Sequence, residues 1–343
     1  MKKALIAMSG GVDSSVAAYL AMEQGFDCCG GTMVLWNNAT QDAASVCNRL
    51  GIPFYVFDGQ AAFREKVVQP FIDAYEAGLT PNPCVFCNNN LKFSWLLDRA
   101  LEKGYEYVVT GHYARIQKDE ATGRSLLYAA PNQQKDQSYF LAGLTPYQLS
   151  HSLFPLGDMT KEEVREIAAQ QGFVSAQKKD SQDICFIPDG DYKAFMEQYT
   201  GKIYPCGSFL TLDGKVVGKH NGAVGYTLGQ RKGLGLAMGS PVYVCGKDMA
   251  ANTVTVGPEQ TLFAKTLWAE NCNFIPFDDL TAPLQVTAKA RSRHGAQPAT
   301  VYPDENGIRV EFAQPQRAIT PGQAVVLYDS DLVIGSGTIT RAE

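Results

Sequence analysis

A glycine-rich turn between a predicted strand and a predicted helix places the strongest constraint on how this chain folds. Residues 3–8 form an apolar run typical of a buried strand, and residues 14–24 have the composition of a helix. The turn between them reads Ser-Gly-Gly-Val-Asp-Ser over residues 9–14. Glycine lets a backbone bend tightly and approach an anion closely, and the N-terminus of a helix carries partial positive charge. This order therefore predicts a phosphate-binding loop at the start of an α/β domain.

The residues around the loop separate it from the two commonest phosphate-binding motifs. No Gly-Lys-Ser or Gly-Lys-Thr follows it, and the third glycine of a dinucleotide fingerprint is missing. Two interpretations remain: an ordinary glycine-rich turn, or a loop that resembles the Ser-Gly-Gly-x-Asp-Ser motif of pyrophosphatase-type ATP-binding enzymes. Members of that family split ATP to AMP and pyrophosphate. The resemblance implies that the loop wraps pyrophosphate and that Asp13 helps to hold Mg²⁺.

Length, charge and cysteine usage limit the class of protein. The 343 residues suffice for two or three domains, and 35 acidic against 30 basic residues give a net charge of −5. This balance does not signal a nucleic-acid partner, although a local basic face would suffice to bind one. No apolar run is long enough to cross a membrane, and the first residues lead directly into a predicted strand rather than a signal peptide. We therefore predict a cytoplasmic protein with no membrane partner, whose nine cysteines are reduced, catalytic or metal-binding.

Strand and helix patterns alternate through the N-terminal half of the chain. Strands are predicted at 26–36, 53–57 and 105–110, and helices at 41–50, 61–75, 91–103 and 160–171. Pro70 predicts a kink, and Thr160 with Glu163 predicts a capping box. Such alternation predicts a doubly wound parallel sheet whose ligand site lies beyond the carboxyl ends of the strands. Residues 111–113 follow one of these strands and would face the ligand.

From about residue 200 the pattern changes to short runs of β-branched and aromatic residues between glycine, proline and Asp-Gly turns. Residues 208–217 and 252–257 are examples, and such runs predict small β-barrels or sandwiches. The predicted architecture is therefore α/β followed by two small β-rich domains. We place a catalytic domain at 1–199, a central small β domain at 200–264 and a C-terminal β-barrel at 265–343.

Two stretches carry cysteines in distinctive surroundings. Residues 80–90 predict a proline-stiffened polar loop with Cys84 and Cys87 ahead of a helix, a position that favours the reactive thiolate. The alternative, half of a structural zinc site, lacks a second paired motif. The other stretch, residues 180–188, holds Cys185 among acidic and apolar residues. For that cysteine by itself, a buried apolar role is the plainer interpretation.

Residues 285–293 place polar side chains at every odd position, which predicts a strand with Lys289, Arg291 and Arg293 on one face. Like charges in a row repel unless an anion covers them. We therefore predict contact with RNA phosphate, and the alternative is a solvated face of a barrel strand.

Six ordered motifs together resemble the bacterial and organellar tRNA-specific 2-thiouridylases, an adenine nucleotide hydrolase-like family. The motifs are the loop at 9–14, TPNPCVFCNNNLKF, VVTGHYAR, KDQSYFL, DSQDICFIP and GYTLGQRKGLG. The resemblance implies ATP-dependent 2-thiolation of the wobble uridine (position 34) of tRNA, with Mg²⁺ as cofactor. In the family, ATP adenylates the C2 oxygen and a cysteine persulfide supplies sulfur. The implied partners are the tRNA anticodon stem-loop and a persulfide donor such as a cysteine desulfurase or a relay protein.

The resemblance also assigns residues. Cys185 matches the cysteine that receives sulfur as a persulfide, and Cys87 matches its partner, which releases the sulfur or forms a disulfide with it. The positions that match nucleotide-binding residues are Ala7, Met8, Ser9, Gly10, Gly11, Val12, Asp13, Ser14, Met33 and Gly111. The positions that match tRNA-binding residues are Asn82, Pro83 and Cys84 at the target base, and His112, Lys135, Asp136, Gln137, Arg291, Ser292 and Gln323 elsewhere.

Two departures from the family pattern leave alternatives open. Cys84 stands where the family often has an aspartate thought to assist proton transfer, so the base is unassigned, and the connection at 35–41 is short. Three cysteines at one site would also suit an iron–sulfur cluster. The remaining alternatives are another AMP-forming synthetase with the same loop, and an RNA-binding protein that consumes no ATP.

Overall fold

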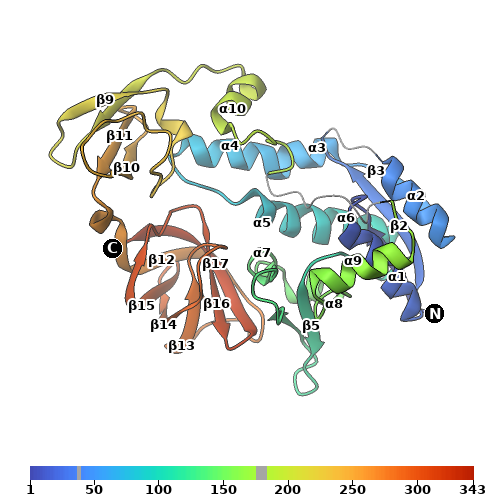
Figure 1. Ribbon diagram of the computed structural model, residues 1–343. Coiled ribbons are helices and arrows are strands. Elements are labelled where there is room, and N and C mark those ends of the chain that lie inside the picture. The colour runs from blue at the N-terminus through green and yellow to red at the C-terminus, as the bar shows by residue number, and fades with distance from the viewer. Residues whose placement is uncertain (37–39, 175–183) are drawn as a thin grey trace.

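The computed structural model describes residues 1–36, 40–174 and 184–343 (Figure 1). Its β-strands form a parallel sheet, a four-stranded sheet and an eight-stranded sheet. Residues 180–183, the first part of the second cysteine stretch, lie outside the described residues, whereas Cys185 lies within them.

The N-terminal sheet is parallel throughout, as predicted. Its strands follow the order β3 (Phe54–Asp58), β2 (Asp27–Val34), β1 (Lys3–Ala7), β4 (Tyr107–Val109) and β7 (Ser152–Leu153). Helices α1 (Val12–Glu23), α2 (Gln41–Leu50) and α9 (Lys161–Gln170) pack on one face, and α6 (Leu96–Glu102) packs on the other. The central strand β1 is buried on both faces because its three middle residues are all apolar and fully covered. The doubly wound α/β prediction is confirmed.

Helix ends follow local chemistry, with one correction. The predicted capping box at Thr160 and Glu163 is present. The predicted loop at 80–90 is wrong, because Cys84 and Cys87 lie in a helix, α5 (Pro83–Cys87), that runs on through η2 (Asn88–Trp95) into α6. The cause is Asn82, whose side chain accepts a hydrogen bond from the Cys84 amide at 3.2 Å, with a proline at the first helical position.

The helix predicted at 61–75 is a single run of three segments. These are α3 (Gln60–Phe63), a π-helical segment η1 (Arg64–Val68) and α4 (Gln69–Glu76), with Pro70 at the start of α4. Pro70 has no backbone N–H and cannot donate a helical hydrogen bond, and the π-helical turn just before it accommodates this loss. The remaining helices are α7 (Ser138–Leu141), α8 (Pro146–Ser150) and α10 (Tyr192–Thr200), with short 3₁₀ turns η3 (Ala223–Gly225) and η4 (Glu259–Leu262).

The β-rich part forms two units, as predicted. The central sheet has the order β10 (Tyr243–Asp248), β11 (Thr253–Gly257), β8 (Gly207–Leu210) and β9 (Val216–His220). The C-terminal strands are β12 (Phe263–Phe274), β13 (Leu284–Lys289), β14 (Gln297–Asp304), β15 (Gly307–Arg317), β16 (Ala324–Asp329) and β17 (Leu332–Ala342). Strand β12 pairs with both β15 and β17, which closes these six strands into a barrel.

A hairpin from the N-terminal domain joins the barrel. Strands β5 (Ala114–Lys118) and β6 (Ser125–Ala129) extend the barrel sheet beside β17, although they belong to the segment predicted as the catalytic domain. Buried residues of the parallel sheet, the hairpin and the barrel, including Leu5, Leu127 and Val326, form one continuous core. The barrel is therefore held against the N-terminal domain by shared packing.

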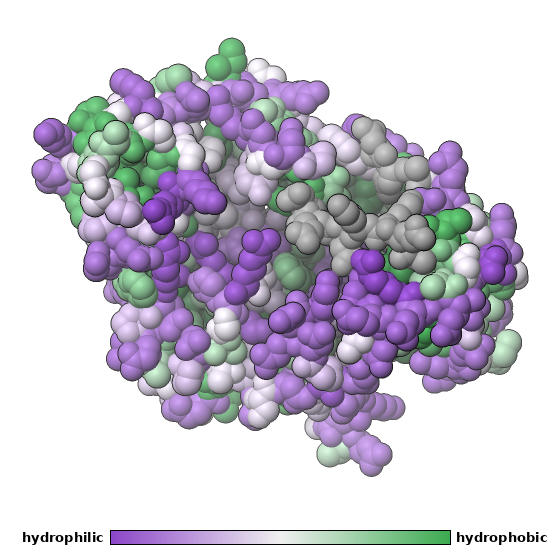
Figure 2. Space-filling view, in the orientation of Figure 1, coloured by the Kyte–Doolittle hydropathy of each residue, from purple (hydrophilic) through white to green (hydrophobic). Residues whose placement is uncertain are grey.

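Much of the outer surface is polar. The face in Figure 2 is hydrophilic over most of its area, and its clearest apolar group lies over the central β domain at the upper left. Among the described residues of that domain, Leu212 and Val216 have exposed side chains.

Candidate active site

The predicted phosphate-binding loop is held by its own serines. Ser14 Oγ accepts a hydrogen bond from the Ser9 amide at 3.2 Å, and Ser9 Oγ accepts one from the Gly11 amide at 3.3 Å. Gly10 has a φ of +76°, and a Cβ there would lie 3.0 Å from Asp42 Cβ. The turn therefore needs glycine at this position.

This loop lines a cavity of about 700 Å³ at the carboxyl edge of the parallel sheet. Such an edge is where open α/β sheets bind their ligands. The loop after β4, the start of α9 and the segment that carries Cys185 form the other walls. The lining residues are Ala7, Ser9, Gly10, Gly11, Val12, Asp13, Ser14, Asp42, Lys92, Thr110, Gly111, His112, Tyr113, Lys135, Gln137, Lys161 and Cys185.

Most of the predicted nucleotide-binding residues lie in this cavity, and two do not. Gly111 packs so closely on the loop that a Cβ there would lie 2.7 Å from the carbonyl carbon of Asp13. Met8 is buried at 3% exposure, and Met33 packs against the apolar core instead of lining the cavity. Their side chains therefore support the sheet behind the site.

Asp13 is already engaged by two partners. Lys161 Nζ donates to both of its carboxylate oxygens, at 2.7 and 2.9 Å, and Tyr113 Oη donates to Oδ1 at 2.8 Å. The Lys161 side chain is 7% exposed and that of Asp13 is 32% exposed. The first residue of α9 thus places a positive charge at the phosphate-binding loop.

All three cysteines lie near enough to Lys92 for its charge to lower their pKa values. The Cys185 side chain lines the cavity, and the nearness of Cys84 and Cys185 contributes to the raised pKa of Cys87. Desolvation raises the pKa of all three thiols, that of Cys87 to about 11, while the nearby ammonium of Lys92 opposes the shift. The side chains of Cys84 and Cys185 are nevertheless exposed, and that of Cys87 is partly exposed. The direction of these shifts runs against the expectation of a favoured thiolate.

One apolar cluster supports both catalytic candidates. Cys87 and Phe86 pack against it from α5, and Phe186, which follows Cys185, lies inside it beside Phe71. The ring centroids of Phe186 and Phe71 are 5.5 Å apart. The two thiols are thus brought to one place by packing of neighbours that are apolar and far apart in the sequence.

The predicted tRNA contacts in the segment 135–137 divide between two environments. Lys135 and Gln137 line the cavity, and Gln137 Oε1 accepts a hydrogen bond from the Tyr113 amide at 2.9 Å. The Asp136 side chain is only 3% exposed and accepts hydrogen bonds from Ser138. Asp136 therefore holds its own turn, which counts against direct contact with RNA.

His112 lines the cavity as a neutral ring. Its Nδ1 lies 2.6 Å from Thr110 Oγ1, and its ring packs between Phe93 and Phe154. Burial and the charge of Lys92 hold its pKa well below the usual value, so the imidazole is uncharged at neutral pH. A hydrogen bond, and not an ion pair, is the contact that this ring offers to a ligand.

The predicted row of three cations is wrong. Strand β13 ends at Lys289, so Arg291 and Arg293 lie beyond it in a turn. Lys289 Nζ lies 3.4 Å from the Asp136 carboxylate, in a pair whose side chains are 17% and 3% exposed. The Asp136 carboxylate, and not an RNA phosphate, is therefore the anion that pairs with Lys289.

Arg291 and its neighbour lie in different surroundings. Arg291 Nη2 donates to the Leu228 carbonyl at 3.0 Å and to Thr320 Oγ1, which links the central domain to the barrel. Ser292 lines a separate cavity of about 990 Å³ between the hairpin β5–β6 and the barrel. Contact of Arg291 and Ser292 with tRNA remains a prediction.

Gln323 ties the barrel to the cysteine helix. Its Nε2 donates to the carbonyl oxygens of Thr80 and Pro81 at 2.8 and 3.3 Å. The Thr80 amide in turn donates to the Pro321 carbonyl at 2.9 Å. These three hydrogen bonds form a clasp between the barrel and residues 80–81, which directly precede Asn82, the N-cap of α5. The barrel therefore helps to set the position of Cys84 and Cys87.

Sequence reasoning missed Lys92, Asp42 and Lys161 as residues of the cavity. Lys92 stands inside the first cysteine motif, and Lys161 is the first residue of a helix whose capping box was recognised. A helix start after a strand in such a fold points toward the carboxyl edge of the sheet, and this signal could have identified Lys161.

Within residues 1–36, 40–174 and 184–343, no three or more His, Cys, Asp or Glu side chains are grouped so that they could hold a metal ion. As they stand, Cys84, Cys87 and Cys185 do not form a ready-made ligand set for zinc or for an iron–sulfur cluster. All nine cysteines are free thiols, so the predicted disulfide between Cys87 and Cys185 stays a prediction. In the part of the chain that the structure describes, no helix has the length and apolar character needed to cross a membrane.

Three family profiles match successive parts of the chain. One described as tRNA methyl transferase HUP domain matches residues 2–189, one described as tRNA methyl transferase PRC-barrel domain matches 193–258, and one described as Aminomethyltransferase beta-barrel domain matches 264–339. Fold and cavity together define a HUP-type α/β domain, with its ligand site at the sheet edge, joined to two β domains.

Curated relatives narrow the class further. The tRNA-specific 2-thiouridylase MnmA of Clostridioides difficile is 46% identical over 356 residues, with 99% of each chain covered. That of Heliobacterium modesticaldum is 47% identical, covering 98% of this chain and 92% of the relative. The chain belongs to the family of tRNA-specific 2-thiouridylases. A solved 4-thiouridine synthetase in complex with RNA and ATP is 18% identical, with a TM-score of 0.39 over 55% of this chain and 45% of that one.

Proposed function

We propose that this chain is an ATP-dependent tRNA-uridine 2-sulfurtransferase, which replaces the C2 oxygen of the wobble uridine with sulfur. The observation that carries the proposal is the position of Cys185, which lines the same cavity as the phosphate-binding loop at residues 9–14. An enzyme that activates a carbonyl oxygen with ATP and then delivers sulfur needs both groups within reach of one base. Family membership supports the choice of substrate.

Adenylation of the base comes first. The uridine C2 oxygen attacks the α-phosphorus of ATP, the bond to the β-phosphate breaks, and pyrophosphate leaves into the loop at 9–14. Lys161 and the N-terminus of α1 supply positive charge where that pyrophosphate collects. Asp13 and Asp42 are carboxylates of the kind that Mg²⁺ shares with phosphate oxygens, and the ion would neutralise charge on the phosphates there.

Sulfur transfer follows in two exchanges. The terminal sulfur of a persulfide on Cys185 attacks C2, and the C–O bond breaks with AMP as the leaving group. Cys87 then attacks the Cys185 sulfur, the S–S bond to the base breaks, and 2-thiouridine leaves with its sulfur. The resulting Cys87–Cys185 disulfide is reset by an external thiol reductant. A persulfide donor, such as a cysteine desulfurase or a relay protein, reloads Cys185.

The walls of the cavity suit a flipped base. A base inside an anticodon loop must leave its stack to be reached by both ATP and a thiol. The neutral imidazole of His112 lines the cavity and would face such a base, and Cys84, at the start of α5, would approach it from outside the lining residues. The raised pKa of the Cys84 thiol argues against this residue as the group that takes the proton from the base.

Mass spectrometry of tRNA nucleosides tests the proposal. Purified protein is incubated with tRNA, ATP, Mg²⁺ and a persulfide donor (a cysteine desulfurase with cysteine), and 2-thiouridine and pyrophosphate are measured. Cys185→Ser and Cys87→Ser should abolish thiolation in the presence of a persulfide donor. Cys206→Ser is the matched control, because that thiol is exposed and lies in the central domain.

Each alternative gives a different result in this assay. Another AMP-forming synthetase would release pyrophosphate but keep its activity in Cys185→Ser. A protein that only binds RNA would release no pyrophosphate. A cluster-dependent thiolase would require iron and labile sulfide after anaerobic purification, so full activity of metal-free protein would end that mechanism.

A further inference from the structure

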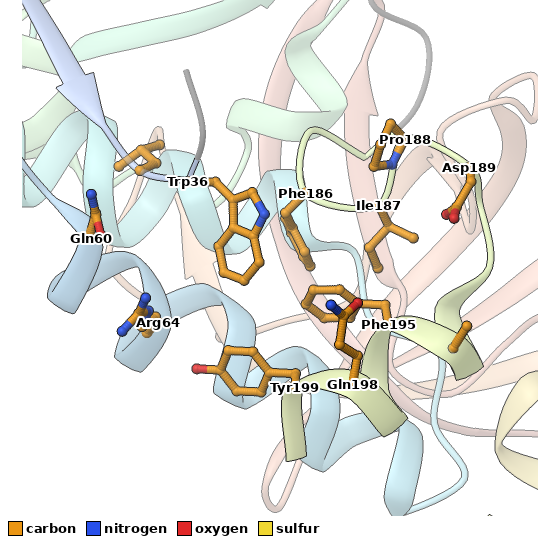
Figure 3. Close-up of a pocket in the computed structure, with 12 residues that line it drawn as sticks. Trp36, Gln60, Arg64, Phe186, Ile187, Pro188, Asp189, Phe195, Gln198 and Tyr199 are labelled. Carbon is orange, nitrogen blue, oxygen red and sulfur yellow. The ribbon is translucent and has the colours of Figure 1, made fainter. Parts of the chain in front are cut away.

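A second cavity borders the segment that carries Cys185 (Figure 3). Its volume is about 640 Å³, within the about 300–1,000 Å³ typical of sites for small ligands. Cys185 lines the reaction cavity, and the next residue, Phe186, lines this second one. Consecutive residues thus face two cavities, and the mechanism above uses only the first.

Aromatic rings form the wall of the second cavity. Figure 3 shows Trp36, Phe186 and Phe195 gathered together, with Tyr199 beside them. The Trp36 ring centroid lies 5.8 Å from Phe195 and 6.2 Å from Tyr199. Phe186 is buried, whereas the other three side chains are only partly covered. The cavity therefore presents ring faces to a ligand on a base of packed apolar side chains.

Polar groups stand at the rim. Gln60 and the exposed Arg64 come from the start of the α3–η1 run, and Gln198 comes from α10. Side-chain amides both donate and accept hydrogen bonds, and a guanidinium group pairs with phosphate. The carboxylate of Asp189 lies at the opposite end of the cavity from Arg64 (Figure 3), so this carboxylate does not compete with a bound anion for the guanidinium group.

We propose that this aromatic cavity is a stacking site for the base next to the wobble uridine in the anticodon loop. The inference rests on the proposed function, because it assigns a second part of the same RNA substrate. Rings, amides and one arginine are the groups by which proteins bind unstacked single-stranded bases. Because the consecutive residues Cys185 and Phe186 line the two cavities, the cavities adjoin. An RNA strand with one base in the reaction cavity would therefore bring the neighbouring base to the second cavity.

Stacking at this site would also explain how the reaction cavity receives its base. An anticodon loop keeps its bases stacked on one another, so extraction of one base exposes the face of the next. The rings of Trp36 and Tyr199 replace the contact that the neighbour loses. The structure thereby assigns to these two residues a role in substrate binding, with no contact to the reacting atoms.

Fluorescence of a modified RNA tests the site directly. The probes are anticodon stem-loop RNAs with 2-aminopurine on either the 5′ or the 3′ side of the wobble uridine. At one of these positions, binding to the wild-type protein should quench the fluorescence through stacking. Trp36→Leu and Tyr199→Leu should each remove the quench and weaken RNA binding about tenfold, the scale of one lost base–aromatic stack. Trp36→Phe, which keeps a ring, should retain most of both.

Controls separate stacking from misfolding and from other partners. Tyr147→Leu removes a ring that is 57% exposed and lines neither cavity, so it should change nothing. Thermal unfolding of each variant shows whether the fold survives, and Tyr199→Leu changes a partly exposed ring on α10 if Trp36→Leu does not fold. A wild-type protein that forms 2-thiouridine without quenching either probe would overturn this inference and leave the proposed function standing. Failure to form 2-thiouridine at all would count against the proposed function itself.

A protein partner would give a different pattern. If the ring variants slowed thiolation with a persulfide donor protein but not with inorganic sulfide, and RNA affinity were unchanged, the cavity would be a docking site for the donor. That outcome would also overturn the assignment to RNA.

Discussion

Substitution of Gly111 by alanine tests whether the close approach of two backbones sets the nucleotide site. A Cβ at this position would lie 2.7, 2.8 and 2.9 Å from the carbonyl carbon, Cβ and carbonyl oxygen of Asp13. Two of these atoms belong to the backbone, so they move only if the phosphate-binding loop moves with them. Overpacking of this kind costs about 1–3 kcal/mol. That is a fraction of the about 5–15 kcal/mol that holds a typical domain folded, so Gly111→Ala should fold with a Tm lower by about 2–10 °C.

The functional loss should exceed the loss of stability. Displacement of a binding group by about 1 Å can reduce a rate about a hundredfold, and in the proposed complex ATP contacts both the loop at 9–14 and the end of β4. We expect ATP affinity, measured by isothermal titration calorimetry, to fall at least about tenfold, with a similar fall in tRNA-dependent pyrophosphate release. Gly246→Ala is the matched control, since a Cβ there meets only Thr255, at 3.8 Å. Normal ATP affinity and an unchanged Tm in Gly111→Ala would refute the reasoning.

Three further predictions concern a buried lysine, the thiols and the clasp between domains. Burial lowers the pKa of Lys247 from 10.5 to about 8, and its Nζ has no hydrogen-bond partner among the described residues. The folded state therefore binds this proton less tightly than the unfolded state, so the free energy of unfolding should rise between pH 8 and 10.5. At pH 7, Lys247→Met should raise the free energy of unfolding by up to about 3 kcal/mol. Chemical denaturation at several pH values should show a flatter pH dependence for this variant than for the wild type; a variant with the wild-type pH dependence would contradict this. Alkylation of Cys87 by iodoacetamide at pH 8 should be about a hundredfold slower than that of a thiol with the ordinary pKa of 9.0, and slower still in Lys92→Met; rapid labelling near neutral pH would show that the thiol is not buried in solution. Gln323→Ala removes two hydrogen bonds to the segment before α5, so kcat should fall while RNA affinity stays near that of the wild type; a lower affinity with unchanged kcat would instead favour the predicted contact of Gln323 with tRNA.

Features that depend on a few neighbouring residues could be predicted from the sequence. The apolar run of β1, the glycine turn at 9–14 and the capping box of α9 each follow from local chemistry, and the structure contains all three. Their order along the chain was enough to predict a parallel sheet and the edge at which Gly111 and His112 would lie. The resemblance of the three cysteine positions to the family pattern predicts that they act at one site.

Local reasoning failed once at a nearby group and once at a distant one. A loop is predicted at Cys84 and Cys87, but the side-chain cap at Asn82 starts the helix before both residues. Lys289 was expected to face RNA, yet Asp136, which is 153 residues away in the sequence, already lies against it. The thiol pKa values depend on burial by elements that no local pattern includes.

The sequence by itself determined the elements, their order and the chemical groups available, because backbone preference and apolar periodicity act over a few residues. Only the tertiary structure decided which of those groups meet. The hairpin at Ala114–Ala129 joins the barrel sheet, and Gln323 reaches back 243 residues to hold Thr80. Such contacts form because separate apolar surfaces are buried together in one core, and the free energy of that burial depends on area and shape that no short stretch of sequence contains.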